Sequence, residues 1–158
     1  MSNRIGKRGE SIFSTIISRY VPAYGYLLDP VFLGDKFQTI DFYVDLLEYP
    51  QKRGFFFASV KTTTQGYYED NSRLKINVDA QELRELGRFA VPVYLFGIDE
   101  VQESGYFLSA NHIFTGSNLN GIPTRHPVDI NNIRLLWEEV SSFWNTHNQL
   151  SAFTSNFQ

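Results

Sequence analysis

Two residues of opposite charge, Asp41 and Lys61, have the spacing of a small catalytic centre. Residues 40–47, IDFYVDLL, alternate between apolar and polar positions, as do residues 55–62, FFFASVKT, so both segments are predicted strands. The segment between them, 48–54, carries Pro and Gly and predicts a hairpin loop. Such a hairpin brings Asp41 and Lys61 to one side of a sheet, opposite the apolar side chains.

A carboxylate and a lysine at one strand end suit metal-assisted hydrolysis of a phosphodiester. The carboxylate can hold Mg²⁺, which polarises the phosphate and activates a water, while the ammonium orients that water or neutralises developing charge. The same two residues could instead form a surface ion pair worth less than about 1 kcal/mol. Glu10 is a third candidate, because it borders the apolar stripe of a predicted helix and could reach the sheet. It could equally serve only to offset the helix macrodipole.

The surrounding pattern predicts an α/β fold, with a mixed sheet flanked by helices. Residues 1–146 are expected to form one domain, and 147–158 a polar tail. The run at 91–98 is almost wholly apolar, which is typical of a strand buried on both faces. In chain order the predicted elements are a helix at 9–21, strands at 40–47, 55–62 and 74–78, a helix at 79–88 capped by Asp79, strands at 91–98 and 105–110, and a helix at 129–144.

Composition narrows the function classes. The chain has 158 residues, 42% of them hydrophobic, which is enough for a core without disulfides. It has no cysteine, which excludes a thiol nucleophile and any cysteine-based metal site. No apolar run approaches the ~20 residues of a membrane span, so no membrane partner and a cytoplasmic location are expected. The first 88 residues hold 12 Lys and Arg against 11 Asp and Glu, and the rest 2 against 6, so any phosphate contact is expected in the first half.

Four segments together resemble one known family. They are RGE at 8–10, IDFYVDL at 40–46, FFFASVKTTTQG at 55–66, and the segment 74–99, which contains Val-Pro-Val. Their order resembles the PD-(D/E)XK nucleases, and most closely a family of short bacterial domains of undetermined function related to Mrr-type restriction enzymes and Holliday-junction resolvases. The resemblance covers roughly residues 8–100 and implies a restriction-endonuclease-like mixed sheet flanked by helices.

Matched to the family motifs, Asp41 corresponds to the metal-binding aspartate and Lys61 to the motif lysine. Glu10 corresponds to the helix glutamate that helps hold metal or orient the lysine, and the Val60 carbonyl to a further metal ligand. Ser59 departs from the pattern, because that position usually carries Glu, Asp or Gln. A hydroxyl is a poorer ligand for a hard divalent cation than a carboxylate, so the site is one charge short.

The resemblance therefore implies two alternative functions. The first is a Mg²⁺- or Mn²⁺-dependent DNA endonuclease, or nuclease subunit, of a restriction, defence or mobile-element system, acting with DNA and as a homodimer or with a partner subunit. The second is a catalytically inactive module of the same fold that binds DNA or protein, as Ser59 would favour. Asp45, on the same predicted face as Asp41, could replace the missing carboxylate if the strand end lets it reach.

Overall fold

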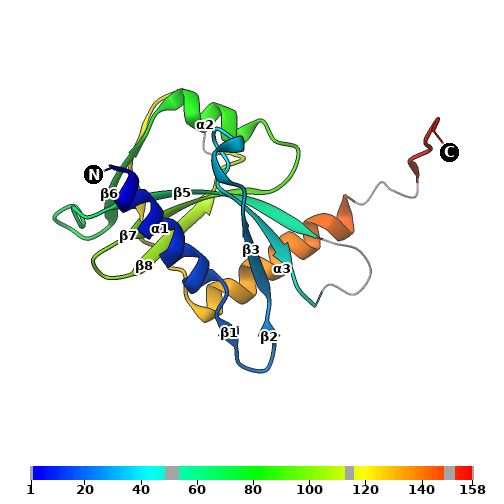
Figure 1. Ribbon diagram of the computed structural model, residues 1–158, viewed down its shortest axis with the longest axis horizontal. Helices are drawn as coiled ribbons and strands as arrows, with labels where there is room; N and C mark the ends of the chain where they lie inside the picture. The colour runs from blue at the N-terminus through cyan, green and yellow to red at the C-terminus, as the bar shows by residue number, and fades with distance from the viewer. Residues whose placement is uncertain (1, 49–53, 113–115, 148–151, 158) are drawn as a thin grey trace.

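The computed structural model describes residues 2–48, 54–112, 116–147 and 152–157 (Figure 1). Its elements are α1 (Ser2–Ile17), β1 (Tyr20–Val21), β2 (Gly25–Tyr26), β3 (Leu28–Phe32), the 3-10 turn η1 (Gly34–Lys36), β4 (Phe42–Leu46), β5 (Phe55–Thr63), β6 (Arg73–Val78), α2 (Ala80–Gly87), β7 (Val93–Asp99), β8 (Ser104–Ser109), β9 (Leu119–Pro123) and α3 (Ile130–Thr146).

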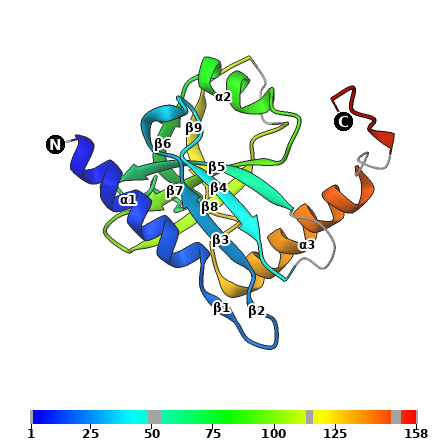
Figure 2. The ribbon, with the colours of Figure 1, turned by 45° about the vertical axis from the view of Figure 1, so that its right-hand side comes forward.

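A five-stranded mixed sheet forms the centre, in the order β3-β4-β5-β7-β8. The first three strands form an antiparallel meander, and β5 then runs parallel to β7 through a crossover that contains α2. The strands β6 and β9 pair with each other as a separate two-stranded sheet. Figure 2 shows α2 on one side of the large sheet and α1 and α3 on the other. The predicted α/β fold with flanking helices is therefore confirmed.

Alternation along the strands gives the sheet two apolar faces. On the face of α1 and α3, Phe13 packs between Phe42 and Phe96, with its ring centroid 4.7 Å from each. On the opposite face, Leu83 and Leu86 of α2 join a second core with side chains from β6, β7 and β9. Strand β7 is buried along its whole length, as its apolar sequence predicts.

Helix α1 begins and ends earlier than predicted. Its sequence stripe suggested 9–21, but the helix covers Ser2–Ile17, and Tyr20–Val21 pairs instead with Gly25–Tyr26 in a small hairpin. Gly9 sets how close the helix lies to the sheet, because a Cβ at this position would stand 1.7 Å from Thr62 Oγ1 of β5. This close packing fixes the position of the neighbouring residue, Glu10.

Besides the short strands β1 and β2, the longer strands β3 and β9 were not predicted, since each contains a residue that usually interrupts strands. Pro30 lies in β3, which tolerates it because β3 is an edge strand of the sheet. Gly121 lies in β9 with φ of 89°, and a Cβ there would come within 2.9 Å of the Arg73 side chain, so this position requires glycine. A glycine in the sequence favours a loop, which is why the strand β9 was missed. The predicted strand at 74–78 exists as β6, outside the large sheet.

The remaining elements agree with the sequence in outline. Asp79 caps α2 by accepting the N–H of Glu82 at 2.8 Å, and Asp129 caps α3 in the same way. Ile130, predicted in the buried stripe of the last helix, is instead 45% exposed in its first turn. Most of the predicted hairpin loop and part of the predicted tail lie outside the described residues. Among the described helices none is both long and apolar enough to cross a membrane.

Candidate active site at the end of β4

Asp41 stands immediately before β4 and continues its ladder with β5. Its backbone N–H donates to the carbonyl of Ala58 at 3.0 Å. Its side-chain Oδ2 then accepts the N–H of Val60 at 2.6 Å. In a regular antiparallel pair, a backbone carbonyl of β4 would accept this N–H. Here the Asp41 carboxylate accepts it instead, and the bond fixes the carboxylate beside β5.

The strand register places two of the predicted site residues on one side. Phe42 faces Ala58 across the β4–β5 pair, so Ser59 and Lys61 project to the opposite side, the side covered by α2. Regular alternation does not place the Asp41 side chain, because Ile40 packs in the core on the α2 face and Phe42 in the core on the α1 face. Within a strand, the N–H and C=O of one residue point to the same edge. The Val60 carbonyl therefore points to the edge at which the Asp41 carboxylate lies.

Lys61 forms an ion pair with Glu82, which lies in the first turn of α2. The side chains of Lys61 and Glu82 are 33% and 21% exposed, so the pair is accessible from solvent. The sequence analysis did not identify Glu82 as a site residue. The sequence feature that could have indicated Glu82 is the predicted N-cap at Asp79. A helix capped there has residue 82 in its first turn, and this helix directly precedes the parallel strand β7.

The Asp41 carboxylate carries charge that its surroundings do not fully offset. Burial raises its pKa, and the nearby charge of Glu82 raises it too, while the Val60 N–H and the Lys61 ammonium lower it. The net direction is upward, so the folded protein holds this carboxylate at a cost. A bound cation would relieve that cost.

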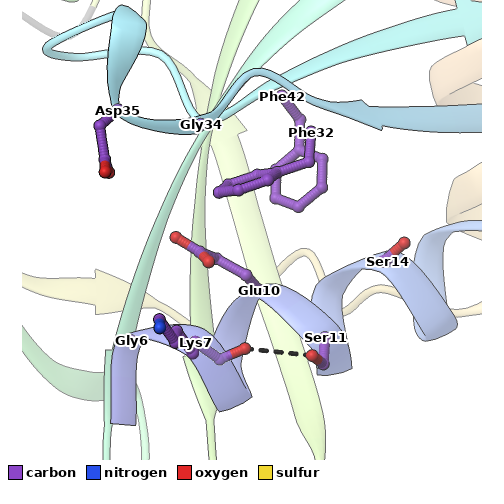
Figure 3. A pocket seen from close by; sticks show the side chains of 9 residues that line it. All are labelled: Gly6, Lys7, Glu10, Ser11, Ser14, Phe32, Gly34, Asp35 and Phe42. Carbon is purple, nitrogen blue, oxygen red and sulfur yellow. Dashed lines mark hydrogen bonds between the residues drawn. The ribbon is translucent and has the colours of Figure 1, made fainter. Parts of the chain in front are cut away.

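Glu10 occupies the other side of the same region. It reaches from α1 into a cavity of about 770 Å³, where it points toward Asp35 beside the Gly34 turn and Phe32 (Figure 3). Burial raises the pKa of Glu10, and the charges of Asp41 and Asp35 raise it further against the opposing charge of Lys7. Asp41 and Glu10 therefore lie near enough to repel.

Ser59 and Asp45 do not supply the missing carboxylate. Ser59 is 1% exposed, and its hydroxyl has no hydrogen-bond partner within the described parts of the chain. Asp45 lies four residues along the strand from Asp41, a separation of about 13 Å, where it accepts a hydrogen bond from the Tyr43 hydroxyl at 3.3 Å. The expectation that Asp45 could compensate for Ser59 is therefore wrong, because both carboxylates are held in one extended strand.

The donor set suits a cation that keeps much of its water. Within residues 2–48, 54–112, 116–147 and 152–157, no group of three or more acidic or His side chains is arranged to enclose a metal ion. Mg²⁺ is usually bound by one or two carboxylates together with waters and substrate phosphate oxygens. Asp41 and the Val60 carbonyl, with Glu10 or Glu82 nearby, fit this pattern of few protein ligands and several waters.

No protein-family model, curated protein or solved structure matches this chain.

Proposed function

We propose that this protein is a Mg²⁺- or Mn²⁺-dependent endonuclease that hydrolyses phosphodiester bonds in DNA. The observation that supports this most directly is the Asp41 carboxylate, which the Val60 N–H fixes just before β4 and beside β5, the strand that carries Lys61. A fixed carboxylate beside a backbone carbonyl can hold a cation, and an accessible ammonium can stabilise the charge that develops on a phosphate.

Each residue has a distinct part in this proposal. Asp41 and the Val60 carbonyl would hold the cation, which would supply polarisation of the phosphate and a lower pKa of a water. Lys61 donates a hydrogen bond to the attacking water or to a non-bridging phosphate oxygen. Glu82 keeps the Lys61 ammonium in place until the phosphate arrives.

Glu82 also offers the negative charge that Ser59 lacks. It reaches the Lys61 ammonium from α2, whereas the family pattern would place a carboxylate two residues before the lysine in β5. The three carboxylates of Asp41, Glu10 and Glu82 outnumber the two ammonium groups beside them, Lys61 and Lys7, which favours recruitment of a cation.

A plasmid-nicking assay with Mg²⁺ or Mn²⁺ tests the proposal. Asp41→Asn and Lys61→Met should each reduce cleavage at least about 100-fold. Asp29→Asn is the matched control, because Asp29 is an exposed acid on the edge strand β3 away from the site. Cleavage that persists in Asp41→Asn at the level of Asp29→Asn would exclude this site.

The second candidate is a catalytically inactive module that binds DNA or protein. It is favoured by the buried Ser59 hydroxyl, which has no hydrogen-bond partner among the described residues, and by the ion pair of Lys61 with Glu82. In this case calorimetry should detect no Mn²⁺ binding that depends on Asp41, and any DNA binding should weaken steeply as salt rises. Metal binding that is lost in Asp41→Asn would argue against the inactive module.

A further inference from the structure

Three exposed tyrosine side chains gather on the small hairpin of β1 and β2, which projects beyond the end of the large sheet (Figure 1, Figure 2). Tyr20, Tyr24 and Tyr26 are 56%, 54% and 59% exposed. We call this segment, residues 20–26, the tyrosine hairpin. Proteins seldom collect large aromatic side chains on one exposed segment unless it contacts another molecule. The candidate active site uses none of the three.

The hairpin is held firmly at its base. Val21 and, just after the hairpin, Leu27 are 4% and 3% exposed and belong to the core on the face of α1 and α3. The N–H of Tyr24 closes the turn by donating to the Val21 carbonyl at 2.9 Å, and Ala23 and Gly25 have φ of 70° and 91°. The aliphatic side chains therefore anchor the hairpin in the core, and the tyrosines remain outside it.

Each ring is positioned by a neighbour. The Tyr20 and Tyr26 rings meet edge to face with their centroids 5.3 Å apart. The Arg134 guanidinium of α3 lies over the Tyr24 ring, 5.8 Å from its centroid. Cross-strand pairing accounts for Tyr20 and Tyr26 alone, since Tyr24 lies in the turn outside the paired positions. Rings that are already held in place lose little freedom when a planar group packs against them.

The charge beside these rings favours a phosphate-bearing partner. Arg19 is the only charged residue in the segment 11–28, and it is exposed. Arg134 adds a second guanidinium, although Glu138 pairs with it at 2.7 Å, and the acid Asp29 follows the hairpin in β3. Guanidinium groups match the geometry of phosphate oxygens. Proteins that bind single-stranded nucleic acid combine such cations with exposed aromatic rings on which bases stack.

A further cavity, of about 260 Å³, follows α1 from the hairpin toward the candidate active site. Arg19 lines it at one end and Arg8 at the other. Ser11 lines both this cavity and the one that contains Glu10, so the two adjoin. Arg8 pairs with Glu103, whereas Arg19 has no ion-pair partner among the described residues. Arg19 is therefore the cation on this path that a phosphate can reach without breaking an ion pair.

We propose that the tyrosine hairpin stacks against unpaired bases of a DNA strand whose scissile phosphate lies at Asp41. The six residues from Tyr26 to Phe32, which lines the Glu10 cavity, span at most about 20 Å. Stacked nucleotides rise about 3.4 Å each, so the hairpin meets bases about six nucleotides from the cleaved bond. The substrate is therefore DNA with a single-stranded segment beside the cut. The cut rests on the proposed nuclease function, whereas stacking on the tyrosines does not.

Fluorescence anisotropy of a labelled oligo(dT), and of a duplex of equal length, tests the stacking when each is titrated with the full chain in EDTA. The oligo(dT) should bind at least about fivefold more tightly than the duplex, whose bases already stack on one another. Tyr24→Ala and Tyr26→Ala should each weaken oligo(dT) binding at least about fivefold. Tyr24→Phe should not, because stacking needs the ring and not the hydroxyl. Tyr68→Ala is the matched control, at a tyrosine 39% exposed outside the hairpin.

The outcomes separate this proposal from the catalytic one. Asp41→Asn should bind oligo(dT) as the unaltered chain does, so this result stands if no cleavage is found. Arg19→Gln should lower the slope of log affinity against log salt by about one. Unchanged affinity in both alanine variants, or duplex binding as tight as oligo(dT) binding, would overturn the proposal and leave the hairpin as a surface for a protein partner. The comparison of oligo(dT) with duplex uses the unaltered chain, so it decides even if an alanine variant fails to fold.

Discussion

The Asp41 carboxylate accepts the backbone N–H of Val60 at 2.6 Å, at the point where β5 extends beyond the start of β4 and remains paired with β7. A side chain thus extends the ladder by one step. The bond engages one carboxylate oxygen, Oδ2, and it holds the group without the freedom of a surface aspartate. The backbone of Asp41 is also fixed, because its N–H donates to the Ala58 carbonyl and its carbonyl accepts the Leu33 N–H.

Replacing Asp41 by Asn should separate stability from function. The amide oxygen can still accept the Val60 N–H, but the charge that burial and Glu82 disfavour is removed. We expect the melting temperature to rise by about 1–3 °C in buffer containing EDTA, while Mn²⁺ binding is lost. Differential scanning calorimetry with and without Mn²⁺ measures both. A lower melting temperature in EDTA would mean that the carboxylate stabilises the fold.

The raised pKa of Asp41 also predicts a pH dependence. The folded pKa lies above the ordinary value of 3.8, so the folded protein binds this proton more tightly than the unfolded chain. The carboxylate therefore lowers stability at neutral pH, and this cost disappears as the pH falls through the folded pKa. Mn²⁺ affinity should fall over the same range, because proton and cation compete. NMR titration of Asp41 in EDTA should give a midpoint above 3.8, and a midpoint below it would contradict the prediction.

Glu82→Gln tests the role of the ion pair with Lys61. The loss of an accessible pair should change the free energy of unfolding by less than about 1 kcal/mol. The charge of Glu82 raises the pKa of Asp41, so its removal should lower that pKa. If Glu82 positions Lys61, cleavage should fall by at least about tenfold while the fold is retained. Glu85→Gln, one turn along the same helix, is the matched control, and equal activity in the two variants would remove Glu82 from the site.

Ser59→Ala should be neutral or stabilising. The Ser59 hydroxyl is buried without a partner in the described residues, and such a group costs about 1–3 kcal/mol of desolvation. Its removal leaves only a small void, so we expect a gain of up to about 1 kcal/mol in chemical denaturation. Thr63→Ala provides the contrast, because the Thr63 hydroxyl accepts the Gln65 N–H at 3.0 Å and its loss should destabilise. A destabilised Ser59→Ala would indicate that the hydroxyl has a partner, such as a bound water.

Gly9→Ala should destabilise the protein by about 1–3 kcal/mol, since the new Cβ would overlap Thr62 Oγ1 and push α1 from the sheet. Gly6→Ala is the control, because no atom lies within 4 Å of a Cβ at that position. Thr62→Ala should partly rescue Gly9→Ala in a double-mutant cycle measured by urea denaturation. Equal effects at Gly6 and Gly9 would show that the close approach does not matter.

The strand alternation was enough to predict that Ser59 and Lys61 share one side, because side chains in a strand point alternately to its two faces. It could not predict Glu82, whose approach to Lys61 depends on how α2 crosses from β5 to β7. The alternation also could not show that Asp45 is too far from Asp41 to bind the same cation, since two side chains on one face of a strand can be well separated along it. The strand β3 was missed because Pro30 opposes strand formation everywhere except at an edge.

Pro30 has a consequence for how copies of this protein can meet. The bonds from Leu33 to Asp41 and from Leu47 to Leu27 show that alternate residues of β3 pair with β4, so the backbone nitrogen of Pro30 faces outward. That nitrogen has no hydrogen to offer at the middle of the open edge. A second chain therefore cannot pair along the β3 edge without a gap in the hydrogen-bond ladder, which protects this edge against fibre-like association. Any dimer that cuts both strands of a duplex should join through side-chain surfaces and leave this edge free.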